Sequence, residues 1–311
     1  MRLSELVEKY LAYTVLRPKS SHNYELVMKN FIASAGDKDI RHVTSDDAMT
    51  YRDEVLNRAK PVTFNNYRQH LVVLFNFAVD NKWMKANPFA KIKPIRVYKK
   101  PKKTVDLPLI EKVLQVLKGE SGLETDKEPG RFNPQWFWEI AVRLFFFTGM
   151  RLRQLVELEW RDIDFENRCI NLRAEGSKTY REWKIPLPAM MEDDFRLLRA
   201  RTIEARGTRD IYDRQVFCLP LFSWYRKQFV NDEMVEDNVH AFFKRMSKVV
   251  GQPISAHRLR HTTATIIVNQ HSDLKSAQRL LGHTDIRTTL EYVEESLDNM
   301  RTLLDSLRIE A

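Results

Sequence analysis

The sequence has few of the features that mark secreted, metal-binding or membrane proteins. Its 311 residues include only two cysteines, Cys169 and Cys218, which lie far apart. They have neither the paired spacing of a metal-binding knuckle nor the density of a secreted disulfide scaffold, so we expect a reducing, cytoplasmic environment. No apolar run approaches membrane-spanning length, and we expect no membrane partner. The first residues, MRLSELVEKYLAYTV, are interrupted by charges and lack the apolar centre of a signal peptide.

The composition is that of a globular protein with a basic surface. Hydrophobic residues make up 43% of the chain and charged residues 30%, which excludes wholesale disorder. The 51 lysines and arginines exceed the 42 acidic residues and give a net charge of +9, which favours a polyanionic partner, nucleic acid first. Charge alone is weak evidence, because many basic proteins bind no DNA. The length suits two domains.

Apolar residues at helical spacing predict a small four-helix domain over residues 1–90. The second of these helices follows two cap candidates, Ser20 and Ser21. The apolar positions of the four helices are Leu3, Leu6, Val7, Tyr10 and Leu11; Tyr24, Val27, Met28, Phe31 and Ile32; Tyr51, Val55 and Leu56; and Phe64, Tyr67, Leu71, Leu74, Phe75 and Ala78.

A basic linker over residues 91–106 follows this domain. Its first part, KIKPIRVYKKPKK (91–103), holds seven basic residues, two prolines and no acid. Such a run is often only a solvated connector stiffened by proline. The alternative is a strap along a phosphate backbone. The DNA-contacting residues that this alternative predicts are Lys91, Lys93, Arg96, Lys99, Lys100, Lys102 and Lys103.

A second domain is predicted over residues 107–311. It begins with a helix from Leu107, followed by a polar insertion at 119–133 to which the sequence gives no role, and by a helix that starts near Pro134 and stops at Gly149. Residues 169–188 alternate apolar and polar positions around a turn, which predicts a β-hairpin with Lys178 at or beside its tip. The fold class is therefore mainly α with a small antiparallel sheet.

Four segments carry chemically reactive residues whose order and spacing are informative together. They are TGMRLRQLVELEW (148–160), the hairpin with Lys178, HRLRHTTAT (257–265) and LLGHTDIRTTLEYV (280–293). These segments resemble the tyrosine recombinase, or phage integrase, family: its first arginine box, its hairpin lysine, its H-x-x-R box, and its L-G-H followed nine residues later by tyrosine. The resemblance covers residues 107–300 closely and residues 1–90 more loosely, as the family's core-binding domain.

The resemblance implies a site-specific DNA recombinase that cleaves and rejoins strands through a 3′-phosphotyrosyl intermediate. Carried over position by position, it implies a phosphate clamp of Arg151 and Arg260, hydrogen-bonding partners His257 and His283, a general acid Lys178 and a nucleophile Tyr292. The chemistry is consistent with this, because guanidinium groups match the charge that grows on phosphoryl oxygens, and a lysine can protonate the 5′ oxygen. A tyrosyl ester conserves the phosphodiester energy, so no cofactor, metal or ATP is expected.

Single residues in these boxes have plainer interpretations. His261 lies beside the H-x-x-R arginine, but the family pattern gives it no role in the chemistry, and we interpret it as a packing or hydrogen-bonded structural histidine. Lys184 competes with Lys178 for the role of acid, and the turn position favours Lys178. Where the family usually has an acidic residue, this chain has Gln154, which can still orient Arg151 by accepting a hydrogen bond.

Two other functions share parts of this pattern. A type IB topoisomerase uses the same chemistry to relax DNA, and a non-catalytic DNA-binding protein could keep the recombinase fold. The helical N-terminal domain argues against the first, and the filled catalytic positions argue against the second. The sequence does not separate integration or excision by a mobile element from resolution or inversion, nor does it give the DNA site.

The resemblance also implies an assembly. We expect a C-shaped clamp around duplex DNA, with a homotetramer on two recombination sites and nucleoid association when bound. The need for an accessory DNA-bending factor is left open. The tail (about 294–311) has Leu297, Met300, Leu304 and Leu307 on one helical face. This face either folds back on its own domain or, as we favour, contacts a neighbouring protomer.

Overall fold

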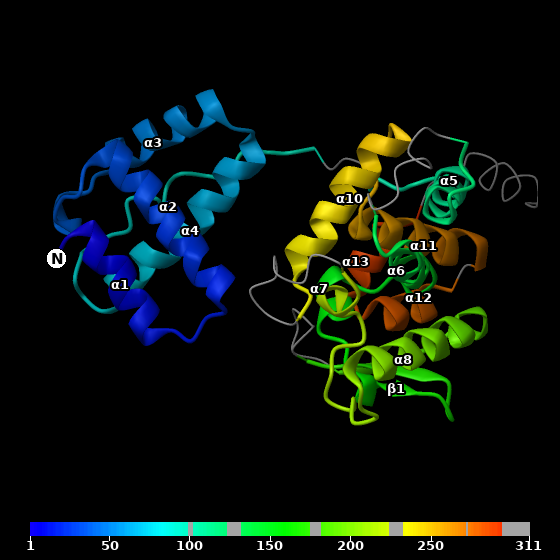
Figure 1. Cartoon of the computed structure of the whole chain (residues 1–311). Coiled ribbons are helices and arrows are strands. Elements are labelled where there is room, and N and C mark those ends of the chain that lie inside the picture. The colour runs from blue at the N-terminus through cyan, green and yellow to red at the C-terminus, as the bar shows by residue number, and fades with distance from the viewer. Residues whose placement is uncertain (99–101, 123–131, 175–181, 224–232, 272, 294–311) are drawn as a thin grey trace, which may run out of the picture. The chain divides into compact units, whose positions relative to one another are not determined.

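The computed structural model describes residues 1–98, 102–122, 132–174, 182–223, 233–271 and 273–293. The chain divides into two compact units, residues 1–100 and 101–311, each with its own hydrophobic core (Figure 1). Among the described helices, none is both long and apolar enough to cross a membrane.

The first unit consists of four helices, as the apolar spacing predicted. They are α1 (Leu3–Tyr13), α2 (Pro18–Ala35), α3 (Ser45–Arg58) and α4 (Pro61–Asp80). The Phe31 ring of α2 packs edge-on against Tyr51 of α3 and Phe75 of α4, which places α2 against both helices. The expected caps Ser20 and Ser21 were wrong: α2 begins earlier, at Pro18, because proline is preorganised for the first helical position.

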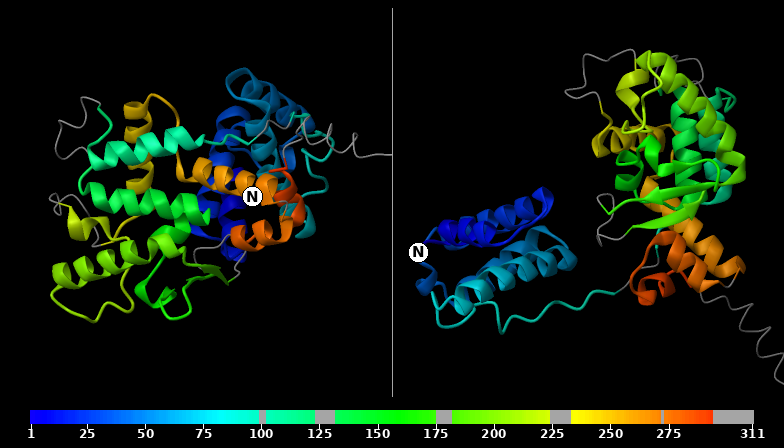
Figure 2. Two further views of the ribbon diagram at one scale, coloured as in Figure 1. Left: turned by 90° about the vertical axis from the view of Figure 1, so that its right-hand side faces the viewer. Right: turned by 90° about the horizontal axis from the view of Figure 1, so that it is seen from below.

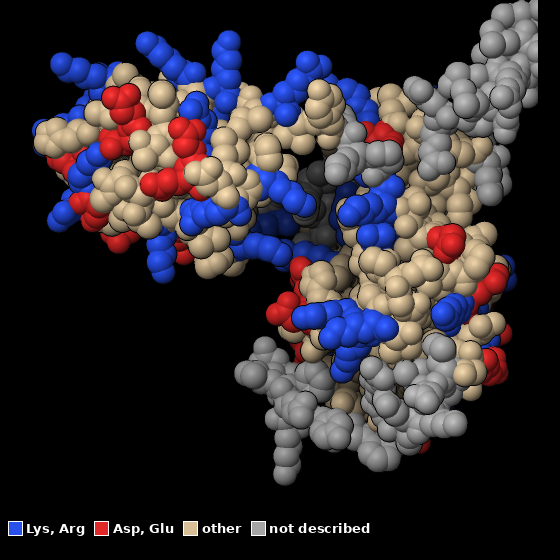
Figure 3. All heavy atoms as spheres, turned by 90° about the horizontal axis from the view of Figure 1, so that it is seen from above, with Lys and Arg blue, Asp and Glu red and all other residues tan. Residues whose placement is uncertain are grey.

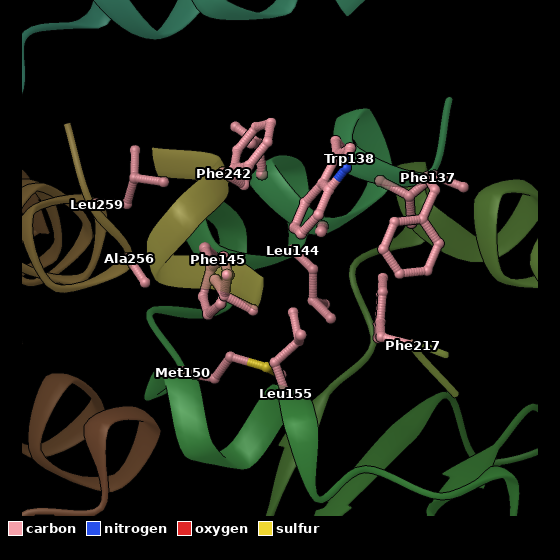
Figure 4. Packing of buried hydrophobic residues seen from close by; sticks show 14 of the residues in the cluster. Phe137, Trp138, Leu144, Phe145, Met150, Leu155, Phe217, Phe242, Ala256 and Leu259 are labelled. Carbon is pink, nitrogen blue, oxygen red and sulfur yellow. The ribbon is translucent and has the colours of Figure 1, made fainter. Parts of the chain in front are cut away.

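The second unit is built around α6 (Gln135–Thr148), which is buried on most sides (Figure 4). The Trp138 ring stacks on Phe242 at 4.2 Å between ring centroids, and Phe137 packs against Phe217. The other helices of this unit are α5 (Leu107–Lys118), α7 (Leu152–Val156), α8 (Glu192–Arg206), α9 (Leu219–Phe222), α10 (Glu236–Val250), α11 (Ala256–His271), α12 (Leu274–Leu281) and α13 (Ile286–Leu290).

A small antiparallel sheet forms one side of this unit. The predicted hairpin is confirmed as β2 (Cys169–Leu172) and β3 (Trp183–Pro186), paired antiparallel. A short strand that the sequence pattern did not indicate, β1 (Ile163–Asp164), adds to the far edge of β2. The hairpin tip at 175–181, with Lys178, lies outside the described residues.

Two glycines place the site residues where helices end. Gly149 ends α6 with a φ of +60°, and an added Cβ would lie 3.1 Å from Leu281. Gly282 ends α12 with a φ of +61°, and an added Cβ would overlap the Trp183 indole. The indole Nε1 donates to the Leu280 carbonyl at 3.3 Å. The glycine of the L-G-H segment therefore lets the hairpin pack directly on the end of α12.

Gly282→Ala should destabilise the second unit more than a matched glycine substitution. Gly207, which ends α8, has a φ of +66°, but nothing lies within 4 Å of an added Cβ. Gly207→Ala should cost about 1 kcal/mol, for the left-handed backbone alone. Gly282→Ala should cost ~1–3 kcal/mol more, because the indole has to move. Urea unfolding followed by tryptophan fluorescence measures both losses, and equal losses would refute the packing role of Gly282.

Candidate active site

The Arg260 guanidinium joins three of the four motif segments. It lies on α11 and is only 3% exposed. Its Nη1 donates to the Gly149 carbonyl at 2.6 Å, and its Nη2 donates to the Leu281 carbonyl at 2.7 Å. The same Nη2 lies 3.1 Å from His283 Nε2. Because a buried cation needs partners, these contacts fix the ends of α6 and α12 around α11.

The contacts of His283 determine its tautomer. Arginine can only donate, so Nε2 of His283 accepts from Arg260 and Nδ1 carries the proton. Nδ1 then donates to the Thr289 hydroxyl of α13 at 2.9 Å. Burial, and then the charges of Arg260 and Arg151, lower the pKa of His283 to about 4. A neutral His283 therefore connects Arg260 to the helix that precedes Tyr292.

Tyr292 lies just after α13 and beside this histidine. Its side chain is 4% exposed, and its ring is parallel to the His283 ring with centroids 6.1 Å apart. Burial raises the pKa of Tyr292, while Arg260 and Lys102 act in the opposite direction. The phenol is thus held in a buried, cationic environment. Figure 2 shows α11, α12 and α13, in orange to red, side by side in both views.

Arg151 is the second guanidinium of the site. It is the N-cap residue of α7, and its backbone N–H donates to Gln154 Oε1 at 2.7 Å. Gln154 therefore orients Arg151 by accepting a hydrogen bond, as expected, but through the backbone rather than the guanidinium. Arg151 Nη1 is buried without a hydrogen-bond partner in the described part of the chain, and burial lowers the pKa of Arg151. A buried unpaired N–H is costly, so this atom is available to donate to an acceptor that enters the site.

The two histidines of the H-x-x-R segment occupy different environments. His257 is exposed, and its ring lies edge-on to His261 with centroids 4.1 Å apart. His261 is 6% exposed, and its Nδ1 lies 2.9 Å from the Tyr292 hydroxyl. His261 is hydrogen-bonded, as expected, but sequence reasoning missed its partner. Its place one helical turn after His257 was the available signal.

The sheet determines which face Lys184 occupies. Successive residues of a strand point to opposite faces, and Trp183 packs on Gly282 next to His283. Lys184 therefore points to the other face of β3, where its charge lowers the pKa of Asp164 on β1 after the stronger effect of hydrogen bonds from Asn167. This face argues against Lys184 as the acid. Lys178 itself is not among the described residues.

The linker reaches the site through Lys102. Its ammonium forms an ion pair with Glu291 at 2.8 Å, beside Tyr292 in the chain. Thr262 of α11 bonds to both the backbone N–H and the carbonyl of Val105, which holds the end of the linker against α11. The predicted DNA contacts are untested. Lys91, Lys93, Arg96, Lys102 and Lys103 are exposed, and Figure 3 shows the abundance of lysine and arginine on the surface; Lys99 and Lys100 lie outside the described residues.

Comparisons with known families match both units. The model of the phage integrase family matches residues 135–298, and that of the phage integrase N-terminal domain matches residues 1–96. A Pseudomonas syringae protein with the provisional name tyrosine recombinase XerC is 30% identical over 98% of this chain. The chain spans 64% of that relative's length.

Solved structures share the fold. The Tn1549 transposon integrase, in complex with a circular intermediate DNA, matches with a TM-score of 0.73 at 20% identity, over 99% of this chain and 100% of that one. A lambda integrase tetramer bound to a Holliday junction matches with a TM-score of 0.70 at 19% identity, over 95% of this chain and 78% of that one. These matches show that the chain shares the fold of these proteins.

The neutral histidines predict a loss of stability in acid. Burial and, after it, nearby positive groups lower the pKa of both His261 and His283 from 6.5 to about 4. Below pH 6.5 the unfolded chain therefore binds more protons than the folded chain. The stabilising contribution of the two neutral histidines is complete above pH 6.5 and is lost as the pH falls toward 4. At pH 5.5 the loss should be on the order of 1 kcal/mol for each histidine.

Urea unfolding at pH 7.5 and 5.5 measures this loss. Tryptophan fluorescence reports mainly the second unit, because five of the six tryptophans lie there. His283→Gln should lose less stability between the two pH values than the unmodified chain, since one titrating group is gone. His240→Asn, at an exposed position of α10, should keep the full loss. An unchanged pH dependence in His283→Gln would contradict the assignment of a neutral His283.

Proposed function

The chain belongs to the phage integrase family of tyrosine recombinases, and from this we propose that it is a site-specific DNA recombinase with Tyr292 as its nucleophile. The observation that carries the proposal is the convergence of Arg151, Arg260 and His283 around the buried phenol of Tyr292. Three of the four motif segments, distant in the sequence, meet there, which supports a common site.

The arrangement supports chemistry on a phosphodiester. Three N–H groups of Arg260 bond to Gly149, Leu281 and His283, and a further side-chain hydrogen bond joins Arg260 to Tyr292. Arg151 Nη1 adds an unpaired donor. In phosphoryl transfer, charge develops on the non-bridging oxygens, and fixed guanidinium donors stabilise it most where water is excluded. Tyr292 lies beside the arginines of its own chain, which supports attack in cis.

In the proposed reaction, the Tyr292 oxygen attacks phosphorus and the bond from phosphorus to the 5′ oxygen breaks. The 5′ oxygen takes a proton from Lys178, and a 3′-phosphotyrosyl ester remains. A 5′ hydroxyl of DNA then attacks the ester, releases Tyr292 and restores a phosphodiester. The ester keeps the energy of the original bond, so the cycle needs no ATP. Independence of metal ions and other cofactors stays a prediction.

We also propose the partners that the family implies. The substrate is double-stranded DNA with two recombination sites, bound by a homotetramer whose protomers clamp the duplex in a C shape. The lambda integrase tetramer on a Holliday junction supports this assembly by analogy of fold. The tail at 294–311, proposed to contact a neighbouring protomer, lies outside the described residues. A cytoplasmic location and the optional DNA-bending factor stay predictions.

Tyr292→Phe should bind recombination-site DNA with unchanged affinity but form no covalent adduct. The substitution removes the attacking oxygen, with its hydrogen bond to His261, and keeps the ring contacts of the side chain with His261 and His283. The measurement is denaturing electrophoresis of protein with a nicked suicide substrate, which traps the ester. Tyr212→Phe, at an exposed position remote in the sequence, is the matched control and should keep forming the adduct. A persistent adduct in Tyr292→Phe would disprove the assignment of the nucleophile.

Lys178→Ala should be rescued by a substrate with a 5′-bridging sulfur. A thiolate leaves without protonation, so cleavage of this substrate does not need a general acid. It still needs the arginines that stabilise the charge on the phosphate. Cleavage by Lys178→Ala should therefore recover on the sulfur substrate, while Arg151→Ala should stay orders of magnitude slow, since ~4 kcal/mol of lost stabilisation is about a thousandfold in rate. Recovery of Lys184→Ala instead would show that the wrong lysine was chosen.

A further inference from the structure

We propose that His261 is the general base of strand cleavage: its Nδ1 takes the phenolic proton of Tyr292 as the oxygen attacks phosphorus. The inference rests on the proposed function, because it needs Tyr292 as the nucleophile. It gives a catalytic role to a residue that the family pattern left without one.

The geometry is that of a preformed proton transfer. His261 Nδ1 and the Tyr292 hydroxyl lie 2.9 Å apart, within hydrogen-bond distance. Both side chains are nearly buried, at 6% and 4% exposure, and their ring centroids are 5.3 Å apart. His261 directly follows Arg260 on α11, so the base and the clamp are carried by the same helix. Thr262, bonded to Val105, fixes this part of α11 against the linker.

The other two histidines of the site are less suited to the task. His283 accepts from Arg260 through Nε2 and donates to Thr289 through Nδ1, so neither nitrogen has a lone pair for the phenol. His257 is exposed, and its ring contacts that of His261. Among the described residues, His261 is the histidine hydrogen-bonded to the Tyr292 hydroxyl.

The charges around His261 make its basicity depend on whether DNA is bound. Burial, then His257, Lys102, Arg260 and Arg258, lower the pKa of His261 to about 4, so the imidazole is neutral and can accept a proton. It is a weak base while these positive groups are uncompensated. A DNA phosphate at the arginines adds negative charge within the same site and offsets them. The basicity of His261 therefore rises when the substrate arrives.

The step is balanced in both directions. In cleavage, the bond between the Tyr292 oxygen and phosphorus forms, the bond to the 5′ oxygen breaks, and the phenolic proton moves to Nδ1. In rejoining, the imidazolium returns this proton to the departing Tyr292 oxygen as the 5′ oxygen attacks. Lys178 handles the proton of the 5′ oxygen, so each oxygen has its own proton carrier.

The test combines His261→Asn with a more acidic nucleophile. Asparagine keeps an acceptor near the Nδ1 position but cannot take up the proton. With the natural Tyr292, single-turnover adduct formation by His261→Asn should be about a hundredfold slower, a usual size for general-base catalysis. With 3,5-difluorotyrosine at position 292, which ionises more readily, His261→Asn should recover to within a few-fold of the unsubstituted histidine. DNA affinity and melting temperature check that each variant is folded.

His257→Asn is the matched control, one helical turn away on the same helix. Its adduct formation should be equally impaired with tyrosine and with difluorotyrosine. The inference is overturned if His261→Asn stays equally slow with both nucleophiles, which would make the histidine only a support, or if His257→Asn is the variant that recovers.

A measurement without a His261 substitution covers the case in which that variant does not fold. In the otherwise unmodified chain, adduct formation with natural Tyr292 should change little between pH 6.5 and 8.5, because the proton goes to His261. A tenfold rise for each pH unit would mean attack by a preformed tyrosinate and would overturn the inference. Failure of the proposed function is distinguishable from both results, because it appears as an adduct in Tyr292→Phe.

Discussion

The buried charge of Arg260 is the constraint on which the rest of the site depends. A guanidinium removed from water is stable only if its donors are paired, and here the Gly149 and Leu281 carbonyls and the His283 ring pair them. These partners come from two segments: Gly149 follows α6, and Leu281 and His283 lie at the end of α12. The requirement to satisfy one cation thus brings together the turn after α6, the end of α12 and the helix α11.

The two glycines and the hairpin follow from this constraint. The carbonyl of Gly149 can reach Arg260 because the chain turns there with a positive φ and packs closely against Leu281. Gly282 lets the Trp183 indole cover the end of α12, next to His283. The same contact anchors β3, a strand of the hairpin in which the proposed acid is predicted to lie. Two residues of the L-G-H motif therefore have a structural explanation: Gly282 packs closely against Trp183, and the His283 ring bonds to Arg260 and Thr289.

Charge and burial together define what the site can do. Burial, and after it nearby positive groups, lower the pKa of His261 and His283 and keep them neutral, while the arginines oppose the effect of burial on the pKa of the Tyr292 phenol. The result fits the proposed reaction: guanidinium donors suited to a phosphate, a buried tyrosine as the proposed nucleophile, and one neutral histidine in hydrogen-bond contact with it. The ion pair of Lys102 with Glu291 connects the linker to the same segment. The linker is thus joined by an ion pair to the segment that carries the proposed nucleophile, next to the proposed arginine clamp.

The sequence by itself indicated the four helices of the first unit, the helices that begin near Leu107 and Pro134, and the hairpin, because apolar spacing and turn residues are local properties. The six proposed catalytic positions came from the resemblance of four short motifs to the family. The sequence could not give the short strand β1, which owes its place to pairing with β2, or the start of α2 at Pro18, where the serines were a competing local signal. Tertiary structure alone decided which face of β3 Lys184 occupies and that the His261 ring lies within hydrogen-bond distance of the Tyr292 hydroxyl. These are distances between residues far apart in the chain, and they are fixed by packing that no single segment encodes.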